Sequence, residues 1–492
     1  MDKWKRHTQV VRGIQGQINK LYTQKKAHAK LASLKYRTKE SFTIRTKGYK
    51  SGCHNIYCGA LDQIIDIDPN KQIAHVEPRV SMEALVKAAL PYGLIPPVIP
   101  ELKMITVGGA IMGMGAESAS HQWGSFNDAC SSFDLIRGDG TLIKATPTEN
   151  ADLFYGVPGS YGSLGALALA ELALIPAKEC VHLKYHVFSN AQQALEKLHT
   201  CTSQPNPPLF LDAIIFSKTL AVVMEGGVED KKNVTHLPHY RAEKPMFYQH
   251  VKEIAITNHS QPYQEWMTHP DYFFRYDPGA FWMGAYVLHF PLSLRLVKEG
   301  LWRTSRPKAE AFNDEEIAQF HRLPETNHRP YTFLRPLLSG KNLCKLLHQA
   351  ETWIQNRFVI QDFCIPEHNA AHFLTAVCED PAIFPIWLLP AKGTATPQIF
   401  APHLLPHGKS NGRVVNFGIY GVPSHASPIK EVTKRLEQLT TSNGGRKALY
   451  ARSYYDPGEF WKIYCHPSYE ALREKTLAKG IWHEITAKVL SE

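Results

Sequence analysis

Glycine residues gather in one short stretch of the chain, residues 106–118, which reads TVGGAIMGMGAES. Glycine has no Cβ atom and tolerates positive φ angles, so a glycine-rich backbone lets a ligand approach closely. Its amide groups can then converge on an anion such as a phosphate. The order GxGxxG after a strand is absent, as is the phosphate-loop order GxxxxGK[ST]. The stretch therefore predicts either a phosphate-binding wall or a tightly packed buried loop.

Two further glycine-bearing segments flank this stretch. YKSGCHN (49–55) precedes it, and VPGSYGSLG (157–165) follows it. Three such segments at roughly even spacing in one predicted domain favour a single long ligand that lies along all of them.

The elements that hold these segments can be predicted from hydrophobic periodicity and turn residues. We expect hairpins over 61–78 and 133–147 and a helix that begins after Ser81 and ends at Gly93. Many short strands with helices between them predict an α+β fold for residues 41–178. Residues 179–492 contain aromatic strands such as FPIWLLP and long helical patterns, and they predict a second α+β domain.

The first 50 residues carry most of the positive charge. They hold fourteen Lys/Arg and two Asp/Glu, whereas the other 442 residues sum to −2. Val11, Ile14, Ile18 and Leu21 recur at helical spacing and predict a basic helical lead-in over residues 1–40. Its apolar stripe either docks on the body of the protein or lies on an anionic membrane surface. No nucleic-acid partner is expected, because no aromatic interleaving or known motif accompanies the charge.

Composition restricts the class of protein further. The chain has 492 residues, 44% of them hydrophobic, and no apolar run near the roughly 20 residues that cross a bilayer. Its nine cysteines are scattered and form no CxxC pair. We therefore expect no disulfide framework, no metal site and no transmembrane segment. A reducing, cytoplasmic location is expected, with peripheral membrane contact through the basic helix as an open alternative.

The motifs resemble a known family when taken together. The hairpin LDQIIDIDPNKQIAHVEP, the segment YGLIPPVIP, the TVGG stretch and ENADLFYGVPGSYGSLG resemble the FAD-binding domain of the p-cresol methylhydroxylase (vanillyl-alcohol oxidase) superfamily. PELKMITVGGAIMGMGAESASHQWGSF, RFVIQDFCIP, FPIWLLP, NFGIYGVP and LYARSYYDPGEFWKIY narrow the resemblance to the delta24-sterol reductase family. It covers most of the chain.

The resemblance implies a two-part FAD-binding domain over 41–178, followed by a substrate (cap) domain over 179–492 whose C-terminal part returns to the flavin. It implies non-covalent FAD, NADPH as reductant and a hydrophobic, sterol-like small molecule as substrate. Covalent attachment of FAD through His54 is the less favoured alternative. Glu117 is expected to turn from the diphosphate toward ribose hydroxyls or a basic partner, because like charges repel. The FAD-binding residues it implies are Gly52, His54, Asn55, Thr106, Val107, Gly108, Gly109, Ala110, Ile111, Met112, Gly113, Met114, Gly115, Ala116, Glu117, Ser118, Gly162 and Gly165.

The implied reaction reduces a carbon–carbon double bond. An isolated alkene is unpolarised, so an acid must protonate one carbon while the other receives a hydride. His121, Tyr454 and Glu459 are candidates for this acid. The alternatives are packing at the domain interface for His121, and core packing and a helix start for Tyr454 and Glu459. Asp362 is expected to be buried, with a structural salt bridge as the commoner case.

An oxidase or dehydrogenase acting on an alcohol or sugar lactone is the competing function, because such enzymes share the superfamily. A flavin-free binding module is less favoured, since glycines are intact in all three segments.

Overall fold

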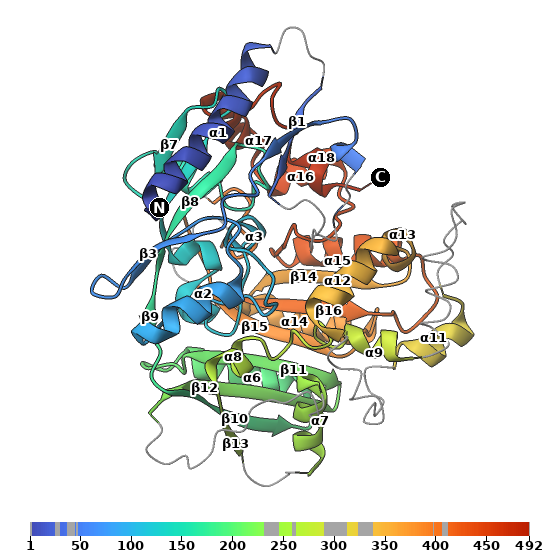
Figure 1. The fold of residues 1–492 in the computed structure, drawn as a ribbon. Coiled ribbons are helices and arrows are strands. Elements are labelled where there is room, and N and C mark those ends of the chain that lie inside the picture. Colours follow the sequence, from blue (N-terminus) through green and yellow to red (C-terminus); the bar gives the residue numbers. More distant parts are fainter. Residues whose placement is uncertain are drawn as a thin grey trace.

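The structure, a computed structural model, describes residues 2–24, 30–36, 45, 48–230, 246–257, 262–289, 312–322, 338–396, 398–405 and 412–491. Two antiparallel sheets organise this part of the chain (Figure 1). The first contains, in spatial order, β3 (Ile64–Asp68), β4 (Ile73–Val76), β8 (Ala166–Ala173), β6 (Cys130–Ile136) and β7 (Leu142–Ala145). The second contains, in spatial order, β13 (Tyr263–Met267), β10 (Cys180–Phe188), β12 (Leu220–Glu229), β11 (Phe210–Ser217), β15 (Ile386–Lys392), β16 (Arg413–Gly421), β14 (Val359–Pro366) and β17 (Arg446–Lys447).

Two short pairs complete the strands: β1 (Ala32–Lys35) runs parallel to β2 (His54–Tyr57), and β5 (Leu94–Ile95) pairs with β9 (Ile175–Pro176). We call the part built on the five-stranded sheet the small-sheet lobe and the part built on the eight-stranded sheet the large-sheet lobe. Helices before β10 are α1 (Lys3–Thr23), α2 (Met82–Ala89), α3 (Val107–Gly113), α4 (Ser120–Trp123) and α5 (Ala151–Gly156). Later helices are α6 (Ala191–Thr202), α7 (Phe247–Thr257), α8 (His269–Phe273), α9 (Met283–Leu288), α11 (Asp314–Phe320), α12 (Gly340–Gln349), α13 (Glu351–Gln355), α14 (Glu367–Glu379), α15 (Ile429–Ser442), α16 (Pro457–Ile463), α17 (His466–Lys475) and α18 (Thr486–Val489).

Local sequence signals account for much of the small-sheet lobe. Both predicted hairpins are confirmed, as β3–β4 and β6–β7. The predicted helix is confirmed too: the Ser81 side chain accepts a hydrogen bond from the amide of Ala84, and Gly93 ends the following turn at φ 68°. The glycine-rich stretch, predicted as a turn or loop, instead forms the short helix α3. The Thr106 hydroxyl accepts from the amide of Gly109 and caps its first turn.

The N-terminal helix α1 docks on this lobe, as one of the two alternatives predicted. Val11, Ile14 and Ile18 are buried against β2 and against Ala166 and Ala168 of β8. Leu167, between them, faces the main core on the other side of that strand, because successive side chains of a strand point to opposite faces. The small alanine side chains let the helix approach closely. Its apolar stripe is therefore covered by protein.

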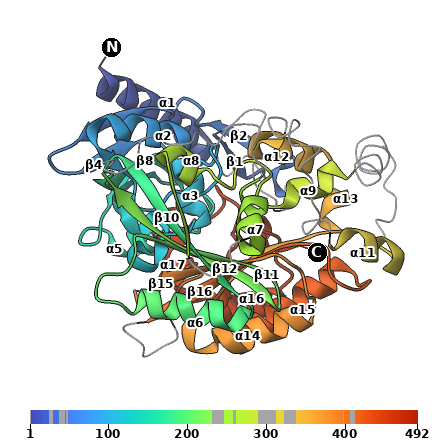
Figure 2. The same ribbon diagram turned by 90° about the horizontal axis from the view of Figure 1, so that it is seen from below.

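The large sheet separates a helix-covered core from a second face by the same alternation. Along β14, Val359, Phe363 and Ile365 pack against α6, α14 and α15, which lie side by side on one face of the sheet (Figure 2). Ile360 and Asp362 fall between them and point to the opposite face. Trp387 of β15 and Asn416 and Tyr420 of β16 share that opposite face.

The C-terminal segment returns to the small-sheet lobe. The Arg473 guanidinium donates to the Ser163 carbonyl at 3.0 Å, and the Lys488 ammonium donates to the Tyr161 carbonyl at 3.0 Å. The amide of Gly138 donates to the Thr476 carbonyl at 2.8 Å. In the residues described, no helix combines the length and the apolar character needed to cross a membrane.

Candidate active site

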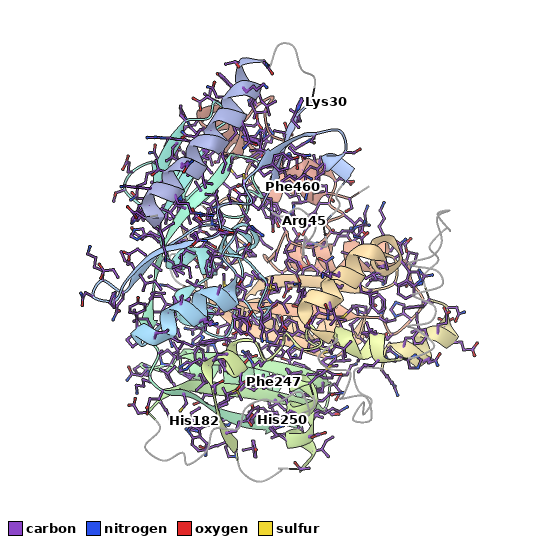
Figure 3. All side chains as sticks on the ribbon, in the orientation of Figure 1. Lys30, Arg45, His182, Phe247, His250 and Phe460 are labelled. Carbon is purple, nitrogen blue, oxygen red and sulfur yellow. The ribbon has the colours of Figure 1, made fainter. Side chains whose placement is uncertain are left out.

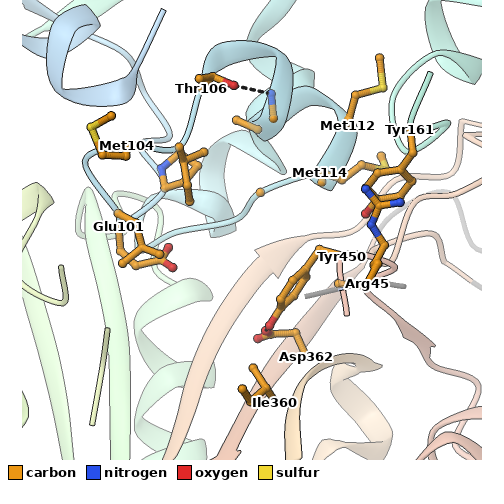
Figure 4. A pocket seen from close by; sticks show the side chains of 18 of the residues that line it. Arg45, Glu101, Met104, Thr106, Met112, Met114, Tyr161, Ile360, Asp362 and Tyr450 are labelled. Carbon is orange, nitrogen blue, oxygen red and sulfur yellow. Dashed lines mark hydrogen bonds between the residues drawn. The ribbon is translucent and has the colours of Figure 1, made fainter. Parts of the chain in front are cut away.

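A cavity of about 750 Å³ is lined by both lobes. One wall is formed by segment 100–116, which includes α3, and by residues around Tyr161 and Gly162. The face of the large sheet formed by β14, β15 and β16 lies opposite, as the close view in Figure 4 shows for Asp362 and Ile360. Ligand cavities commonly measure 300–1,000 Å³. The predicted glycine wall and the aromatic strands of the second domain therefore meet at one site of ligand size.

The residues predicted from the glycine stretch divide between this wall and the core. Val107 and Ile111 are fully buried in the core and do not line the cavity. The stretch residues that line it are Thr106, Gly108, Gly109, Ala110, Met112, Gly113, Met114, Gly115 and Ala116. This pattern follows from the helix, because α3 turns one apolar side into the lobe and leaves the other toward the cavity.

The glycines of this wall have different physical roles. A Cβ atom on Gly108 would lie 2.7 Å from Cβ of Pro78, and one on Gly115 would lie 2.9 Å from Cγ of Pro100. These two glycines serve protein packing. A Cβ atom on Gly113 would have no neighbouring atom within 4 Å, so this glycine faces the open space of the cavity. The amides of Gly108, Gly109 and Gly115 already donate to Pro78 O, Thr106 Oγ1 and Ala110 O, so the amide cradle that we predicted is not free at these positions.

The end of the stretch belongs to a buried contact between the lobes. Glu117 accepts from Arg275 at 2.9 Å, which confirms the basic partner among the two alternatives predicted for it. Arg275 also donates to Asp212 at 3.0 Å, and the Ser118 and Tyr272 hydroxyls share a hydrogen bond of 2.7 Å. Burial raises the pKa of Glu117, which the charge of Arg275 partly offsets. Neither Glu117 nor Ser118 belongs to the described cavity lining.

Positive side chains cluster at one end of the cavity. Lys35, Arg45, Lys50 and Lys488 all line it. Arg45 stacks on the ring of Tyr161, 3.8 Å from its centroid, near the C-terminal helices (Figures 3 and 4). Burial, followed by the charges of Arg45, Arg473 and Lys50, lowers the pKa of Lys488 well below its usual value. Cations gathered in this way repel one another, so this end of the cavity suits an anion such as a phosphate.

The other two glycine segments contribute unequally. Gly162 and Gly165 line the cavity, and Gly162 has a φ of 71°. In the described lining, the first segment is represented by Tyr49 and Lys50, whereas Gly52, His54 and Asn55 lie outside it. His54 begins β2, and Asn55 is exposed. A covalent bond between His54 and a ligand in the cavity therefore has no support from its position.

A hydrogen-bonded cluster of polar side chains lies in the floor of the cavity. The Asp362 carboxylate accepts from Asn416 Nδ2 at 2.6 Å, from the Tyr420 hydroxyl at 2.9 Å and from the Tyr450 hydroxyl. Burial raises its pKa. In the part of the chain described, Asp362 forms no ion pair within bonding distance, because the neighbouring Lys447 pairs with Glu437 at 3.0 Å. The expected salt bridge is therefore wrong, and hydroxyl and amide donors take its place.

Glu101 faces the same floor from the wall that precedes α3 (Figure 4). It is half-buried because it borders the cavity. Burial raises the pKa of its carboxyl to about 8, and the charges of Glu117 and Asp362 act in the same direction. At neutral pH the group is mainly a neutral carboxylic acid, which can donate a proton.

Apolar side chains line the cavity on the side of α9, α12 and α13. They are Met283, Tyr286, Val287, Leu343, Leu346, Trp353, Ile354 and Phe358. Phe281, Trp387 and Tyr420 extend this surface to the polar floor. The aromatic residues of this lining come from the segments FWMGAY (281–286), FPIWLLP (384–390) and FGIYG (417–421). The segment FFRY (273–276) supplies Arg275 and Tyr276 to the lobe contact.

The three predicted acids lie elsewhere. His121 binds the carbonyls of Ser118 and Pro208 at the lobe interface, at 3.1 and 2.8 Å. The amide of Tyr454 donates to Glu437 at 3.1 Å. Glu459 caps the first turn of α16, where its carboxylate accepts from the amide of Asp456 at 3.1 Å. None of the three belongs to the described lining. Backbone partners hold the side chains of His121 and Glu459, the Glu437 carboxylate holds the backbone of Tyr454, and all three positions match the structural alternatives stated for these residues.

Sequence reasoning missed two residues of the site. Glu101 stands in a proline-rich loop with no periodic signal, and Tyr450 stands in an irregular segment after β17. The strand VIQDF contained the signal that could have found them. Its lone acid alternates with buried apolar residues, and a buried acid needs donors from neighbouring segments.

Comparison with known proteins extends the argument from geometry. Residues 32–146 match a family described as "FAD binding domain". The human delta(24)-sterol reductase is 30% identical over 450 residues, which cover 91% of this chain and 80% of that protein. The Arabidopsis thaliana delta(24)-sterol reductase is 26% identical over 90% of this chain and 78% of that protein. The decaprenylphosphoryl-beta-D-ribose oxidase of Mycolicibacterium smegmatis is 35% identical, but over only 24% of this chain and 26% of that protein.

These findings define an FAD-dependent oxidoreductase with an FAD-binding domain and an α+β fold. Similarity to the oxidase is confined to about a quarter of the chain, whereas similarity to the reductases spans both lobes. The chain belongs to the delta(24)-sterol reductase family.

Proposed function

We propose that this protein uses FAD and NADPH to reduce a carbon–carbon double bond of a sterol-like lipid. One observation carries the proposal: a single cavity joins the glycine wall and its cationic end to an extended apolar surface. An apolar polycyclic lipid requires such a surface with few polar groups. The whole-chain relationship to delta(24)-sterol reductases supports the same substrate class.

The residues present fit FAD. The cationic end suits a diphosphate, and Gly113 leaves open space where a larger residue would intrude. We propose that Lys35, Arg45, Lys50 and Lys488 hold the diphosphate, with the cavity-lining residues of the glycine stretch, Gly162 and Gly165 against the rest of the cofactor. When bound, FAD supplies a hydride carrier that NADPH can reload.

The remaining groups act on the lipid. The apolar side chains of α9, α12 and α13 bind its rings and exclude water, which strengthens electrostatic interactions in the site. Asp362 stays fixed by its three donors near the place where the alkene must lie, and these donors favour its carboxylate form against the burial that raises its pKa. Positive charge that develops on the alkene is thereby stabilised, together with the faces of Phe281 and Trp387.

Membrane contact and a cytoplasmic location remain predictions. The covered stripe of α1 leaves only its polar side for a membrane, where Lys5, Arg12 and Lys20 are exposed. Contact through that side would be electrostatic and would weaken with salt.

The test starts with the visible spectrum of the purified protein, followed by NADPH under anaerobic conditions. Flavin bands that bleach, and then recover on addition of a sterol with a side-chain double bond, support the proposal. Recovery must be matched by saturated sterol in the extract. Bleaching without recovery for any sterol alkene would contradict the substrate, and bands that resist NADPH would contradict the reductant.

A further inference from the structure

We propose that Glu101 is the catalytic acid that protonates the alkene, an inference that rests on the proposed function. Alkene reduction needs a proton donor at the reacting carbons. The donor must face the cavity, hold a proton at neutral pH and have that proton available. Glu101 meets these three conditions better than any other acidic group that the described lining contains.

Other ionisable groups around the floor of the cavity are committed to protein partners. Tyr420 and Tyr450 donate their protons to Asp362, and proximity to that carboxylate and burial raise the pKa of both well above the usual value. A phenol of that kind is a weaker acid than a carboxyl group. His403 bonds to Ser125 at 3.1 Å and lies 2.9 Å from Asp128. The Asp362 carboxyl is already held by three donors, whose hydrogen bonds oppose the burial that raises its pKa.

Glu101 is placed differently. In the part of the chain described, no cation lies within ion-pair distance of its carboxyl, and Arg275, the positive charge that acts on it, is held by Glu117 and Asp212. Figure 4 shows the Glu101 carboxyl directed from the glycine wall toward Tyr450 and Asp362 on the opposite side. It thus stands between the predicted flavin wall and the floor.

The backbone that follows Glu101 is held by hydrogen bonds to two other segments of the chain. The amide of Lys103 donates to Asp277 at 3.1 Å, and the Lys103 carbonyl accepts from the amide of Glu83 at 3.2 Å. The Ile105 carbonyl accepts from the amide of Met82 at 2.8 Å. A general acid must be held at a defined position relative to the substrate, and these bonds fix the backbone close to Glu101.

The proton transfer balances as follows. The carboxyl O–H bond of Glu101 breaks, and a C–H bond forms at one alkene carbon from the alkene's π electrons. The other carbon receives a hydride, so the double bond becomes a single bond. Glu101 is left as a carboxylate and regains a proton from water. One turnover consumes one NADPH and one proton.

Several charged groups bear on Glu101 and set its titration. They come from both lobes and are Glu117, Asp362, Arg275, Tyr420 and Tyr450. Burial and the two carboxylates hold the pKa of Glu101 at about 8. Turnover is therefore expected to be level below about pH 8 and to fall about tenfold per pH unit above it, as the acid form is lost.

The experiment compares Glu101→Gln, Glu101→Asp and the control Glu83→Gln in the flavin-loaded enzyme. Glu83 is a half-exposed carboxylate of α2 that pairs at 3.4 Å with Lys103, which lies on the segment of Glu101. We expect Glu101→Gln to slow reoxidation of the reduced flavin by the sterol alkene about 10²–10⁴-fold. NADPH bleaching should be unchanged, Glu101→Asp should recover part of the rate, and Glu83→Gln should match the unaltered enzyme.

A second readout does not depend on turnover. Infrared difference spectra of the unaltered enzyme between about pH 6 and pH 10 should show a protonated carboxyl band that titrates near pH 8 and is missing in Glu101→Gln. Equal alkene rates in Glu101→Gln and the unaltered enzyme, or survival of the band that titrates near pH 8 in Glu101→Gln, would overturn the assignment. Failure of the unaltered enzyme to reduce any sterol alkene would instead contradict the proposed function, while the band still reports on Glu101.

Discussion

Arg275 provides the sharpest test of how the two lobes are held together. Its guanidinium bonds to Glu117 at 2.9 Å and to Asp212 at 3.0 Å, and the three side chains are 1%, 5% and 1% exposed. Arg275→Met keeps the length of the side chain and removes the charge. Two buried carboxylates then face each other without a cation, and such a loss typically costs about 3–5 kcal/mol.

The structure refines this magnitude. Asp212 keeps the Tyr276 hydroxyl at 2.8 Å and the indole of Trp387 at 3.0 Å, and Glu117 keeps the amide and hydroxyl of Ser118, so each carboxylate retains two donors when the cation is lost. Arg275 also lies 4.3 Å from the centroid of the Tyr272 ring, a cation–π contact of about 0.5–2 kcal/mol. We expect Arg275→Met to lower the free energy of unfolding by about 3–5 kcal/mol.

The sign of the pH dependence follows from Glu117. Burial already raises its pKa in the folded protein, and loss of Arg275 raises it further. An acid whose pKa is higher in the folded than in the unfolded state binds more protons when folded, so stability rises as the pH falls toward the unfolded value of about 4.3. The deficit of Arg275→Met should therefore be smaller at about pH 5 than at about pH 8.

Urea unfolding followed by tryptophan fluorescence measures this difference. The control is Lys479→Met, since Lys479 forms exposed ion pairs with Glu470 and Glu474 that should contribute at most about 1 kcal/mol. A loss of free energy of unfolding in Arg275→Met no larger than that in the control would refute the reasoning. A loss that grows as the pH falls would refute it as well.

Three further predictions concern the cavity and the N-terminal helix. Gly113→Ala should weaken FAD binding about tenfold or more, measured by flavin fluorescence titration, and leave the apoprotein's stability unchanged. Gly108→Ala should lower the apoprotein's free energy of unfolding by about 1–3 kcal/mol, measured by urea unfolding. Lys488→Met should weaken FAD binding yet stabilise the apoprotein near neutral pH. The stability that Lys488→Met gains over the unaltered apoprotein should shrink as the pH rises toward about 10.4, because the buried lysine binds fewer protons folded than unfolded; a gain that grows with pH would contradict this. Ile18→Ala should lower the free energy of unfolding by about 2–5 kcal/mol and leave sedimentation with anionic vesicles unchanged. Lys20→Ser should reduce that sedimentation and leave the free energy of unfolding unchanged.

Features set by local sequence could be predicted, and features set by distant partners could not. The cap at Ser81, the turn at Gly93 and both hairpins depend on neighbouring residues, and all are confirmed. The helix α3 was missed because glycine content outweighed the Thr106 cap. The acids were misplaced for a different reason: His121 and Glu459 were chosen by residue type, but backbone groups across the lobe interface and at a helix start determine where they lie.

Alternation along the large sheet explains how an ordinary core strand supplies polar groups to a site. Val359, Phe363 and Ile365 must face the helices, so the same backbone turns Ile360 and Asp362 toward the cavity. Two of the donors that Asp362 requires, Asn416 and Tyr420, lie beside it in the antiparallel register of β16, and the third, Tyr450, comes from the irregular segment after β17.

The charges of the cavity define a direction. Arg45 lies at the end beside Tyr161, and Glu101 and Asp362 mark an acidic region farther along the cavity (Figure 4). Apolar side chains of α9, α12 and α13 line the remaining part. A ligand with an anionic diphosphate gains Coulomb energy in only one of the two orientations. Its uncharged ring system is then directed toward the acids and the apolar surface. The unfavourable burial of Lys488 is consistent with this order, because a cation that is costly alone becomes favourable once the diphosphate lies beside it.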